Sequence, residues 1–316
     1  MKEKNLCKVG IVGLGPVGMI LAVQFREAGY EVALCDIIQE KINLIRTDGI
    51  KLEGKIIRSA SFNRIYSSVN DMLQSDVDIV IFSVKANHDA LVMKQIGTSV
   101  NKDLNIVIAQ NGIGVEKIFA TVFDESQILR MVVNFAGNLK SPNTVNVTFF
   151  NPPNYVASVN DTRHETARWI TDTMNSIRME TKCVDSQEIK YKAWEKGILN
   201  CGLSALCAVT KLTMKEAMTF PATLELVKCA VTEGAEVAEA EGIKLKDNFL
   251  DFAMNYLGNA GNHYPSLAVD LMNKSETEIE FINQKIVEYG RKHNIRTDVN
   301  LSLTNLVKAI TYKNSL

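Results

Sequence analysis

The sequence predicts an α/β protein, in which a doubly wound parallel sheet occupies the first part of the chain and an all-α domain follows. Three observations predict this fold class. Short β-branched runs alternate with helical patterns through the first half of the chain. A glycine-rich segment, GLGPVG, directly follows the first of these runs. After about residue 181, apolar residues recur at helical spacing only.

The predicted strands of the first half are short and apolar. They are expected at residues 8–12, 30–35, 77–84 and 105–109. Residues 77–84 (VDIVIFSV) are strongly β-branched, which is typical of a strand buried on both faces of a parallel sheet. A helical pattern over residues 18–28 connects the first two strands and ends at Gly29. Residues 130–159 are rich in Val, Thr, Phe and Asn, with three prolines, and are expected to form antiparallel strands that close this domain.

The second half of the chain has the apolar spacing of helices. Helices are expected at residues 190–209, 221–241, 246–258, 276–294 and 300–313. The change of character places the boundary near residue 183, between a dinucleotide-type domain of residues 1–182 and a helical domain of residues 183–316. A length of 316 residues is compatible with two such domains. The long apolar helices of the second domain are compatible with a homodimer.

The composition argues against several classes of function. The chain has 35 basic and 36 acidic side chains and a net charge of −1, so no basic excess indicates nucleic acid or an anionic membrane surface as a partner. No apolar run reaches the ~18 residues of a membrane span, and the first strand begins too early to leave room for a signal peptide. The six cysteines form no CxxC pair, which indicates reduced thiols in a cytoplasmic protein. The four histidines lack ligand spacing, so no metal site is expected.

The glycine-rich segment has the spacing of a dinucleotide-binding loop. Its members are Gly13, Leu14, Gly15, Pro16, Val17 and Gly18. The first glycine permits a tight turn, the second lets the backbone approach a pyrophosphate, and the third allows the helix to pack closely on the strand. The N-terminus of that helix then faces the phosphates. We therefore expect a Rossmann domain that binds a nicotinamide dinucleotide.

Asp36 ends the second predicted strand, where a carboxylate can accept hydrogen bonds from the ribose hydroxyls of NAD. The 2′-phosphate of NADP would meet like charge there, so the sequence favours NAD (NADH) and disfavours NADP. The alternative is that Asp36 is a solvated loop residue. Lys41 and Arg46 are cations nearby in the sequence, but they lie beyond the tip of the strand and are not taken to indicate NADP.

Further motifs extend into the second domain. They are SVKA at residues 83–86, QNGIG at residues 110–114, WEK at residues 194–196 with Asn200, and Pro265-Ser266 with TEIE at residues 277–280. In this order, and together with the glycine-rich segment, they resemble the motifs of the ketopantoate reductase (2-dehydropantoate 2-reductase) family from residue 13 to residue 280. The resemblance implies a Rossmann domain, a helical domain, and reduction of a 2-oxo acid to a 2-hydroxy acid.

The resemblance also implies roles for individual residues. Lys196 corresponds to the catalytic lysine of the family, Glu278 to its acidic partner near substrate and nicotinamide, and Asn111 to an asparagine that contacts cofactor and substrate. Substrate-binding roles are implied for Lys85, Asn200 and Ser266, and Lys85 is also expected near the cofactor. Ser204 is expected in the substrate site as well, at a place where this chain departs from the family. Hydride transfer to a ketone carbon places negative charge on the ketone oxygen, which a nearby ammonium both stabilises and protonates.

Each assignment has a structural alternative. The alternatives are a solvated helix lysine for Lys196, an exposed helix acid for Glu278, a turn residue for Asn111, a strand-end charge for Lys85 and a helix cap for Ser266. His263 is expected to be a loop residue rather than a catalytic base. Trp194 is expected to be a core residue.

Two departures from the family bear on cofactor and substrate. The family commonly uses NADP, whereas Asp36 favours NAD. Four residues after the helix asparagine the family typically has a second asparagine and a proline, where this chain has Ser204 and Ala205 within a small, apolar stretch. That second asparagine resembles a binder of the terminal hydroxyl of ketopantoate. Its absence favours a substrate without that hydroxyl, because an unmatched buried polar group costs ~1–3 kcal/mol.

The leading hypothesis is an NADH-dependent reductase of branched or aromatic 2-oxo acids, with Lys196 as general acid. It would form D-(R)-2-hydroxy acids, as do the D-mandelate dehydrogenases that belong to this family. The first alternative is a 2-dehydropantoate 2-reductase, which converts ketopantoate to pantoate, that happens to use NADH. The alternative from another class is a non-catalytic dinucleotide-sensing protein, against which the presence of Lys196, Asn111 and Glu278 argues.

Overall fold

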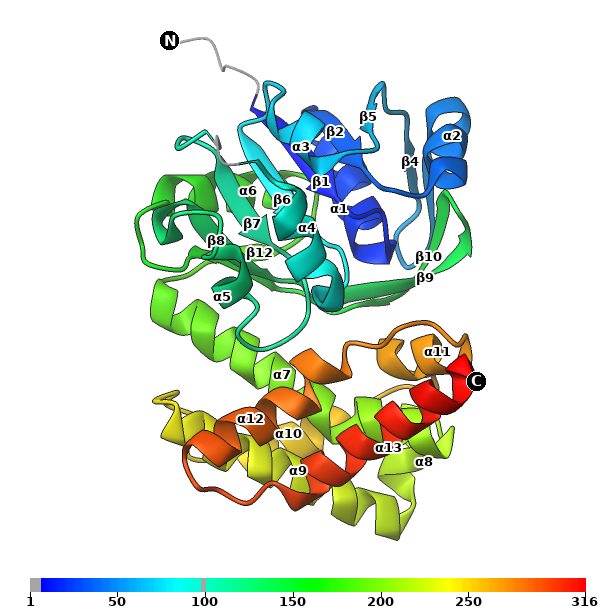
Figure 1. The fold of residues 1–316 in the computed structure, drawn as a ribbon, viewed down its shortest axis with the longest axis vertical. Helices are drawn as coiled ribbons and strands as arrows, with labels where there is room; N and C mark the ends of the chain where they lie inside the picture. Colours follow the sequence, from blue (N-terminus) through cyan, green and yellow to red (C-terminus); the bar gives the residue numbers. More distant parts are fainter. Residues whose placement is uncertain (1–6, 98–100) are drawn as a thin grey trace. The chain divides into compact units, whose positions relative to one another are not determined.

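The chain folds into two compact units, seen in a computed structural model that describes residues 7–97 and 101–316 (Figure 1). Unit 1 contains the described residues up to Gln110 together with Val115–Ile189. Unit 2 contains Asn111–Gly114 and Lys190–Leu316. The division falls inside a long helix, a few residues after the boundary that the composition suggests at residue 183. Composition marks where residue types change, whereas the units reflect which residues pack together.

Unit 1 is built on a sheet of eight strands. In spatial order these are β12 (Thr181–Cys183), β11 (Asn154–Ser158), β8 (Ile128–Val132), β7 (Asn105–Ile108), β6 (Ile79–Phe82), β1 (Lys8–Val12), β2 (Glu31–Cys35) and β5 (Arg64–Tyr66). The six strands from β5 to β8 are parallel to one another. Numbered by their order along the chain and read across the sheet from β5, they follow the spatial order 3-2-1-4-5-6. This is the doubly wound order of a Rossmann sheet, so the predicted fold class is confirmed.

Helix α1 (Pro16–Glu27) lies between two sheets. It packs on β1 and β2 on one side and on a second, four-stranded sheet on the other. The order of that sheet is β4 (Arg58–Ala60), β3 (Ile50–Gly54), β10 (Thr144–Phe150) and β9 (Phe135–Ser141). Because both sides are covered, Met19, Leu21 and Phe25 of α1 are fully buried, as an all-round apolar helix requires.

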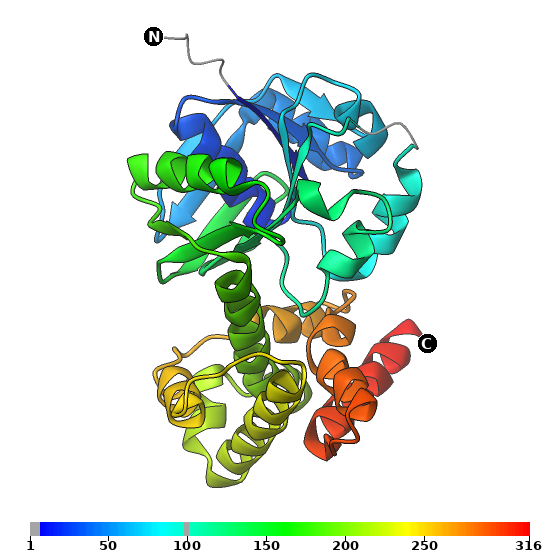
Figure 2. The same ribbon diagram turned by 90° about the vertical axis from the view of Figure 1, so that its left-hand side faces the viewer.

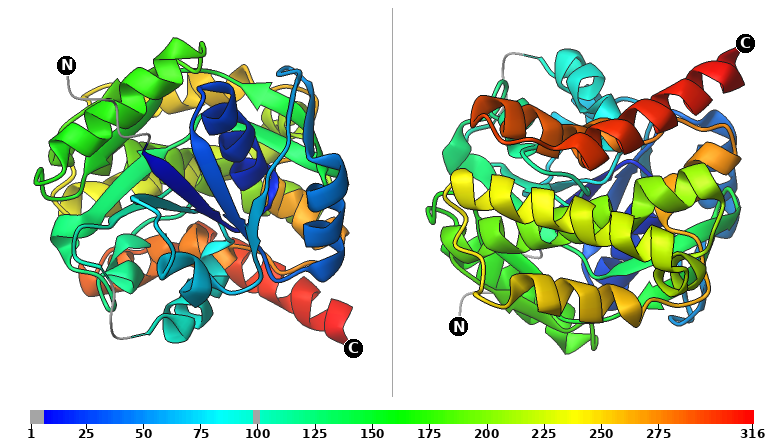
Figure 3. Two further views of the ribbon diagram at one scale, coloured as in Figure 1. Left: turned by 90° about the horizontal axis from the view of Figure 1, so that it is seen from above. Right: turned by 90° about the horizontal axis from the view of Figure 1, so that it is seen from below.

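The remaining helices of unit 1 lie around the main sheet, with helices on both of its faces (Figure 3). They are α2 (Gln39–Asp48), α3 (Val69–Leu73), α4 (Asp89–Gln95), α5 (Glu116–Phe119) and α6 (His164–Ser176). Helix α6 contacts α1 on one face, whereas α3, α4 and α5 contact one another in sequence on the other. Two short 3-10 turns, η1 (Ala86–His88) and η2 (Glu125–Gln127), complete the connections. Helices on both faces explain why the central strands are apolar throughout.

The antiparallel strands expected over residues 130–159 are present. β9 pairs antiparallel with β10, and β11 pairs antiparallel with β8. The partner of β10, the parallel strand β3, and the antiparallel pair of β3 and β4 are not apparent from the sequence. Strand β3 alternates buried and exposed side chains and strand β4 has none fully buried, so neither has the apolar run that marks the central strands.

Unit 2 is entirely helical within the described residues. It contains most of α7 (Ser186–Thr210), with α8 (Met214–Thr219), α9 (Pro221–Ala240), α10 (Phe249–Gly258), α11 (Ser266–Met272), a 3-10 turn η3 (Ile279–Phe281), α12 (Asn283–Lys292) and α13 (Asp298–Ser315). Helices α12 and α13 lie side by side, and both contact α9 (Figure 2). The all-α character predicted for the second half is therefore confirmed.

The helix predicted over residues 276–294 is wrong in its first third. The chain forms the turn η3 and only then begins α12, with Ile282 at φ −115° and ψ −101° between them. A continuous helix would use the carbonyl of Phe281 for an i+4 bond, but that oxygen accepts a hydrogen bond from Ile113 N at 3.0 Å instead. A tertiary contact therefore replaces one helical turn.

Within residues 7–97 and 101–316, no helix is both long and apolar enough to cross a bilayer.

Candidate active site

The glycine-rich loop joins β1 to α1, and its first and third glycines are required by the packing. Gly13 has φ +90°, and a Cβ there would lie 2.6 Å from the backbone nitrogen of Val84. A Cβ on Gly18 would overlap the carbonyl oxygen of Gly13 and the hydroxyl of Ser83. These two positions match the expected tight turn and close helix–strand approach.

Gly15 is different, because its side-chain position is open. A Cβ added at Gly15 would meet no atom within 4 Å, and its φ of −75° is accessible to any residue. The fold itself therefore does not require a glycine here. Gly15 is also the N-cap of α1 and makes no side-chain cap, so the first N–H groups of the helix have no side-chain acceptor among the residues that the structure describes. Open space beside helix N–H groups fits a dinucleotide pyrophosphate.

Ser83, directly after β6, fixes the loop to the neighbouring strand. Its hydroxyl lies 2.8 Å from the carbonyl oxygen of Gly13 and 3.1 Å from that of Val12. β1 and β6 are the strands between which the order of the sheet reverses. Ligands of open α/β sheets bind at the carboxyl ends of the strands at this reversal. The loop is therefore where the topology predicts a cofactor.

Asp36 is not the solvated loop residue that the sequence left as an alternative. Its Oδ2 accepts hydrogen bonds from Leu14 N at 2.9 Å and from Lys41 Nζ at 3.1 Å, and its Oδ1 accepts one from Ile38 N at 2.9 Å. Lys41 Nζ also donates to the carbonyl oxygen of Leu14 at 3.0 Å. Lys41 lies beyond the tip of the strand in the sequence, but its ammonium contacts the carboxylate of Asp36 in the structure. The first turn of α2 brings it back onto Asp36.

Gln110, at the end of β7, anchors the segment that carries Asn111. Gln110 is 6% exposed, and its amide donates to the carbonyl of Val84 at 3.0 Å and to Asp89. Its own carbonyl accepts a hydrogen bond from the buried guanidinium of Arg130 at 2.8 Å. This buried network joins the carboxyl ends of β6, β7 and β8. Gln110 is not among the site residues predicted from the sequence, although a polar residue directly after a buried apolar strand is a signal.

In unit 2, Lys196, Asn200 and Ser204 form one row along α7. They are spaced i, i+4 and i+8, so they share a face of the helix. Ala205 and Cys207 are fully buried in the hydrophobic core of unit 2, with Leu206 and Ala208 beside them. The apolar stretch after Ser204 therefore belongs to the core, and only Ser204 continues the row of Lys196.

Asn111–Gly114 packs within unit 2 rather than with the strand that precedes it. Ile113 N donates to the carbonyl of Phe281, and a Cβ on Gly197 would lie 2.6 Å from Ile113 Cγ1. Gly114 has φ +72°, and a Cβ there would lie 2.8 Å from the hydroxyl of Tyr289. The segment with Asn111 is thus held against both the helix that carries Lys196 and the turn that follows Glu278.

Glu278 is not an acid within a helix. It is the N-cap of η3, and its carbonyl accepts a hydrogen bond from Phe281 N at 2.9 Å. The buried residues Thr277 and Ile279 flank it and fix the backbone on both sides. The carboxylate therefore projects from an anchored turn that is joined to the segment of Asn111.

Buried amides hold this turn to α7. Asn283, the first residue of α12, donates to the carbonyl of Cys201 at 3.0 Å and to Asn300 Oδ1 at 2.9 Å. Asn300 in turn donates to Glu233 at 2.7 Å, and both asparagines are fully buried. Sequence reasoning missed both residues. Two asparagines on otherwise apolar helix faces were the available signal, because buried amides must be hydrogen-bonded.

The remaining predicted residues occupy the following positions. Ser266 is the first residue of α11, whose N-cap is Pro265 without a side-chain hydrogen bond, so the helix-cap alternative for Ser266 is wrong. Lys85 is the N-cap residue of η1, two residues beyond Ser83. His263 lies in the loop before α11, as predicted. Trp194 is a core residue, also as predicted, and its ring centroid lies 5.4 Å from that of Tyr289.

Burial raises the pKa of the Cys35 and Cys207 thiols to about 12. Both are therefore neutral near pH 7 and unsuited to act as nucleophiles.

Comparisons with known proteins agree with this geometry. The profile of the family "Ketopantoate reductase PanE/ApbA" matches residues 9–160, and that of "Ketopantoate reductase PanE/ApbA C terminal" matches residues 188–311. A 2-dehydropantoate 2-reductase of Streptococcus pyogenes serotype M3 is 24% identical over 303 residues, covering 95% of this chain and 97% of the relative. One of Aquifex aeolicus (strain VF5) is 26% identical over 305 residues, covering 95% of each chain.

Two solved structures resemble the whole chain. D-mandelate dehydrogenase in a ternary structure with NADH and anilino(oxo)acetate has a TM-score of 0.87 and 25% identity, over 98% of this chain and 100% of that one. A PanE/ApbA family ketopantoate reductase from Ralstonia eutropha JMP134 also has a TM-score of 0.87, with 23% identity and the same coverage. The chain therefore belongs to the ketopantoate reductase family, a family of oxidoreductases that use a nicotinamide dinucleotide.

Proposed function

We propose that this member of the ketopantoate reductase family is an NADH-dependent reductase of branched or aromatic 2-oxo acids, and that it forms D-(R)-2-hydroxy acids. The observation that carries the proposal is the row of Lys196, Asn200 and Ser204 on α7. It offers an ammonium, an amide and a small hydroxyl along one helix face. An ammonium suits the ketone oxygen of a 2-oxo acid, and an amide can orient its neighbouring groups.

Unit 1 fits a nicotinamide dinucleotide, because the side-chain position of Gly15 is open beside the helix N-terminus. Residues 13–18 would hold the pyrophosphate and Asp36 the adenosine ribose. When bound in its reduced form, the nicotinamide supplies a hydride to the ketone carbon. Lys85, Asn111 and Glu278 are assigned to the cofactor as well as to the substrate.

Lys196 has two tasks in the proposed reaction. Its ammonium stabilises the negative charge that develops on the ketone oxygen, and it then donates a proton from Nζ to that oxygen. The carbon gains a hydride and the oxygen gains a proton, which together convert the 2-oxo acid to the 2-hydroxy acid. Lys196 afterwards recovers a proton from water. A general acid of this kind contributes about 10²- to 10⁴-fold to the rate.

Neighbouring polar groups position the reactants. Asn200, one turn after Lys196, is assigned to orient the substrate or the ammonium. Glu278, on its anchored turn, is assigned to fix the position of the ammonium, and Ser266 to contact the substrate carboxylate. Asn111 is assigned to contact cofactor and substrate together, because its segment is held against both α7 and η3.

Ser204 supports the substrate class. It continues the row of Lys196 and Asn200, and its side chain is much shorter than an asparagine. A substrate with a branched or aromatic group gains room there, whereas the terminal hydroxyl of ketopantoate would lack an amide partner. The similarity to a D-mandelate dehydrogenase that binds NADH and anilino(oxo)acetate supports both the aromatic substrate and the cofactor.

The second candidate function is 2-dehydropantoate 2-reductase. It is favoured by the names of the relatives, which carry that activity at 24–26% identity over nearly the whole chain. Steady-state kinetics with benzoylformate, 2-ketoisovalerate and ketopantoate, each with NADH and NADPH, separate the two. We expect kcat/KM for one of the first two acids to exceed that for ketopantoate by roughly tenfold or more. A clear preference for ketopantoate, or for NADPH, would contradict the proposal.

A substitution at Ser204 tests the substrate argument directly. Ser204→Asn supplies the amide that the family pattern has at this place, so kcat/KM for ketopantoate should rise and that for the bulkier acid should fall. Ser204→Ala is the matched control, because it removes the hydroxyl without adding bulk and should leave the ranking of substrates unchanged. An unchanged ranking in Ser204→Asn would remove Ser204 from the substrate site.

A further inference from the structure

Asp36 and Lys41 form a buried ion pair at the carboxyl end of β2. Their side chains are only 9% and 8% exposed, and Nζ lies 3.1 Å from Oδ2. Both groups also bind Leu14 in the glycine-rich loop, Asp36 through the backbone nitrogen and Lys41 through the carbonyl oxygen. The pair therefore ties the end of β2 and the start of α2 to the pyrophosphate-binding loop.

The hydrogen bonds of this pair use most of the acceptor sites of Asp36 and most of the N–H donors of Lys41. A carboxylate has about four acceptor sites, and Asp36 uses two on Oδ2 and one on Oδ1. An ammonium has three N–H groups, and Lys41 uses two of them within the described residues. One acceptor on Oδ1 and one donor on Nζ remain. Asp36 is thus equipped to accept a single ribose hydroxyl, rather than the two that an unpaired carboxylate could accept.

The pair also changes the charge at the place where NAD and NADP differ. An unpaired Asp36 would repel a 2′-phosphate, but the ammonium of Lys41 cancels its charge and keeps one N–H available. The two residues that follow Asp36, Ile37 and Ile38, are exposed but uncharged and add no compensating charge. Discrimination then rests on one hydroxyl acceptor, and not on charge repulsion.

We propose that Lys41 is a specificity-determining residue, which limits the preference of this chain for NADH over NADPH by neutralising Asp36. The inference rests on the proposed function only in that a nicotinamide dinucleotide binds at residues 13–18. It predicts that the wild-type protein prefers NADH modestly and still binds NADPH. It also predicts that removing the ammonium widens the preference.

Equilibrium binding tests this inference without any substrate. NADH and NADPH are titrated, by the fluorescence of the bound cofactor, into the wild type, Lys41→Met, Lys41→Gln and Lys41→Arg. In Lys41→Met and Lys41→Gln we expect the ratio of the NADPH Kd to the NADH Kd to rise by about tenfold. Lys41→Arg retains the charge and should keep the ratio within about twofold of the wild type.

Two results would overturn the proposal. An equal loss of affinity for both cofactors in Lys41→Gln, with Lys41→Arg unaltered, would make Lys41 a purely structural anchor of Leu14. A wild-type protein that binds NADH but shows no NADPH binding at a thousandfold higher concentration would contradict a neutralised Asp36, even if every variant failed to fold. A wild type that prefers NADPH would refute the proposed cofactor, yet a rise in the ratio in Lys41→Gln would still support the role of Lys41.

Discussion

The two candidate ligand-binding regions of this protein differ in the groups that form them: backbone groups in unit 1 and side chains in unit 2. The region in unit 1 consists of backbone: a glycine turn, the open position of Gly15 and the first N–H groups of α1. The region in unit 2 consists of side chains from three segments, which carry Asn111, Lys196 and Glu278 and are joined by Phe281 and buried amides. The pyrophosphate and the adenosine ribose are thus assigned to unit 1 and proton transfer to Lys196 of unit 2, so substitutions at Gly15 and at Lys196 should affect different functions.

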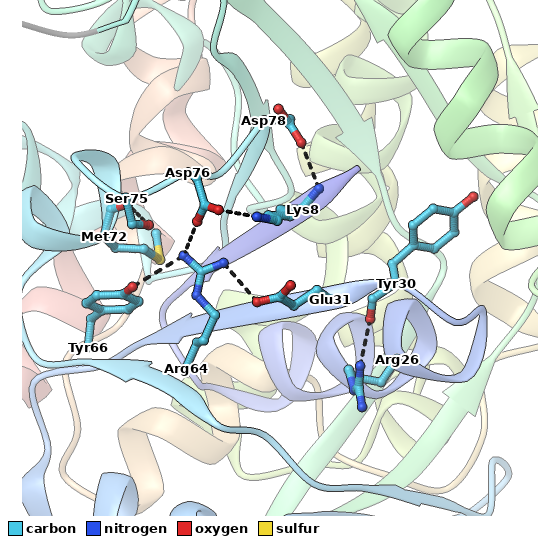
Figure 4. A network of polar contacts seen from close by, with 10 residues as sticks. All are labelled: Lys8, Arg26, Tyr30, Glu31, Arg64, Tyr66, Met72, Ser75, Asp76 and Asp78. Atoms are coloured by element: carbon cyan, nitrogen blue, oxygen red, sulfur yellow. Dashed lines mark hydrogen bonds and ion pairs between the residues drawn. The ribbon is translucent and has the colours of Figure 1, made fainter. Parts of the chain in front are cut away.

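The opposite end of the sheet in unit 1 provides a third region for comparison. At the amino ends of the strands, Arg64 bonds Asp76 at 2.6 Å and Glu31 at 3.0 Å, and Lys8 bonds the same Asp76 (Figure 4). The Asp76 and Glu31 side chains are 62% and 46% exposed, in contrast to the buried pair of Asp36 and Lys41. Exposed ion pairs contribute little to stability, so this network should join strands β1, β2 and β5 without any effect on ligands.

The largest expected effect is that of Lys196→Ala. Loss of the ammonium should lower kcat by about 10²- to 10⁴-fold, because neither the charge nor the proton of Lys196 is replaced. The NADH Kd should change by less than about twofold, since Lys196 is not assigned to the cofactor. Steady-state kinetics and NADH fluorescence measure the two quantities separately. Lys190→Ala, an exposed lysine on the same helix, is the control and should retain full activity.

Gly15→Ala should have the next largest effect, and it should act only on the cofactor. Because a Cβ at Gly15 meets no protein atom within 4 Å, the melting temperature of the protein without cofactor should not change. The NADH Kd should rise by roughly tenfold or more, since the methyl group occupies space assigned to the pyrophosphate. Gly258→Ala, at another open position, should leave the NADH Kd unchanged. Equal NADH affinity in Gly15→Ala and the wild type would exclude the loop as the cofactor site.

Asn283→Ala should reduce stability and loosen the turn that carries Glu278. It removes hydrogen bonds to Cys201 and Asn300 in a fully buried place, which costs about 1–3 kcal/mol. Thermal unfolding should show this loss, and the KM for the 2-oxo acid should rise as the turn of Glu278 loosens. The exposed amide of Asn259 supplies the control variant Asn259→Ala. A KM equal to that of the wild type would mean that the network does not position Glu278.

The smallest effect is expected for Asp76→Asn at the amino ends of the strands. Hydrogen bonds from Lys8, and also from Arg64, lower the pKa of Asp76 from 3.8 to about 2. A depressed carboxyl pKa contributes stability above the unfolded-state value, and this stability is lost as the pH falls through the folded-state value. The melting temperatures of wild type and Asp76→Asn should therefore differ slightly at pH 7 and converge between about pH 4 and pH 2. The Kd values for NADH and NADPH should not change at any pH.

The candidate cofactor site of unit 1 could be predicted from the sequence because the residues of its loop are contiguous. Six neighbouring residues, which connect a strand to a helix and include its first turn, specify the loop, and Asp36 follows the next strand. The contact of Lys41 with Asp36 could not be predicted, because it depends on the first turn of α2 folding back toward the end of β2. The structure alone shows that Asp36, the residue assigned to the ribose, is paired with the ammonium of Lys41.

The candidate catalytic residues of unit 2 could be predicted only through a family resemblance. A lysine on a helix carries no signal by itself, so Lys196 was identified by the motif around it. Residues 276–294 were predicted as one helix because their apolar spacing is helical, yet Phe281 bonds to Ile113, some 170 residues earlier in the chain. Asn283 was missed because buried amides are recognised only when their partners are known.

The most direct test of the central claim is the product of one reaction. Wild-type protein, NADH and benzoylformate are incubated together, and the 2-hydroxy acid formed is resolved by chiral chromatography. We predict stoichiometric oxidation of NADH and formation of (R)-mandelate, with the rate lost in Lys196→Ala. Formation of the S enantiomer would contradict the assigned stereochemistry. NADH binding without oxidation, with benzoylformate and with the other two acids alike, would contradict the assignment of this chain as a 2-oxo acid reductase.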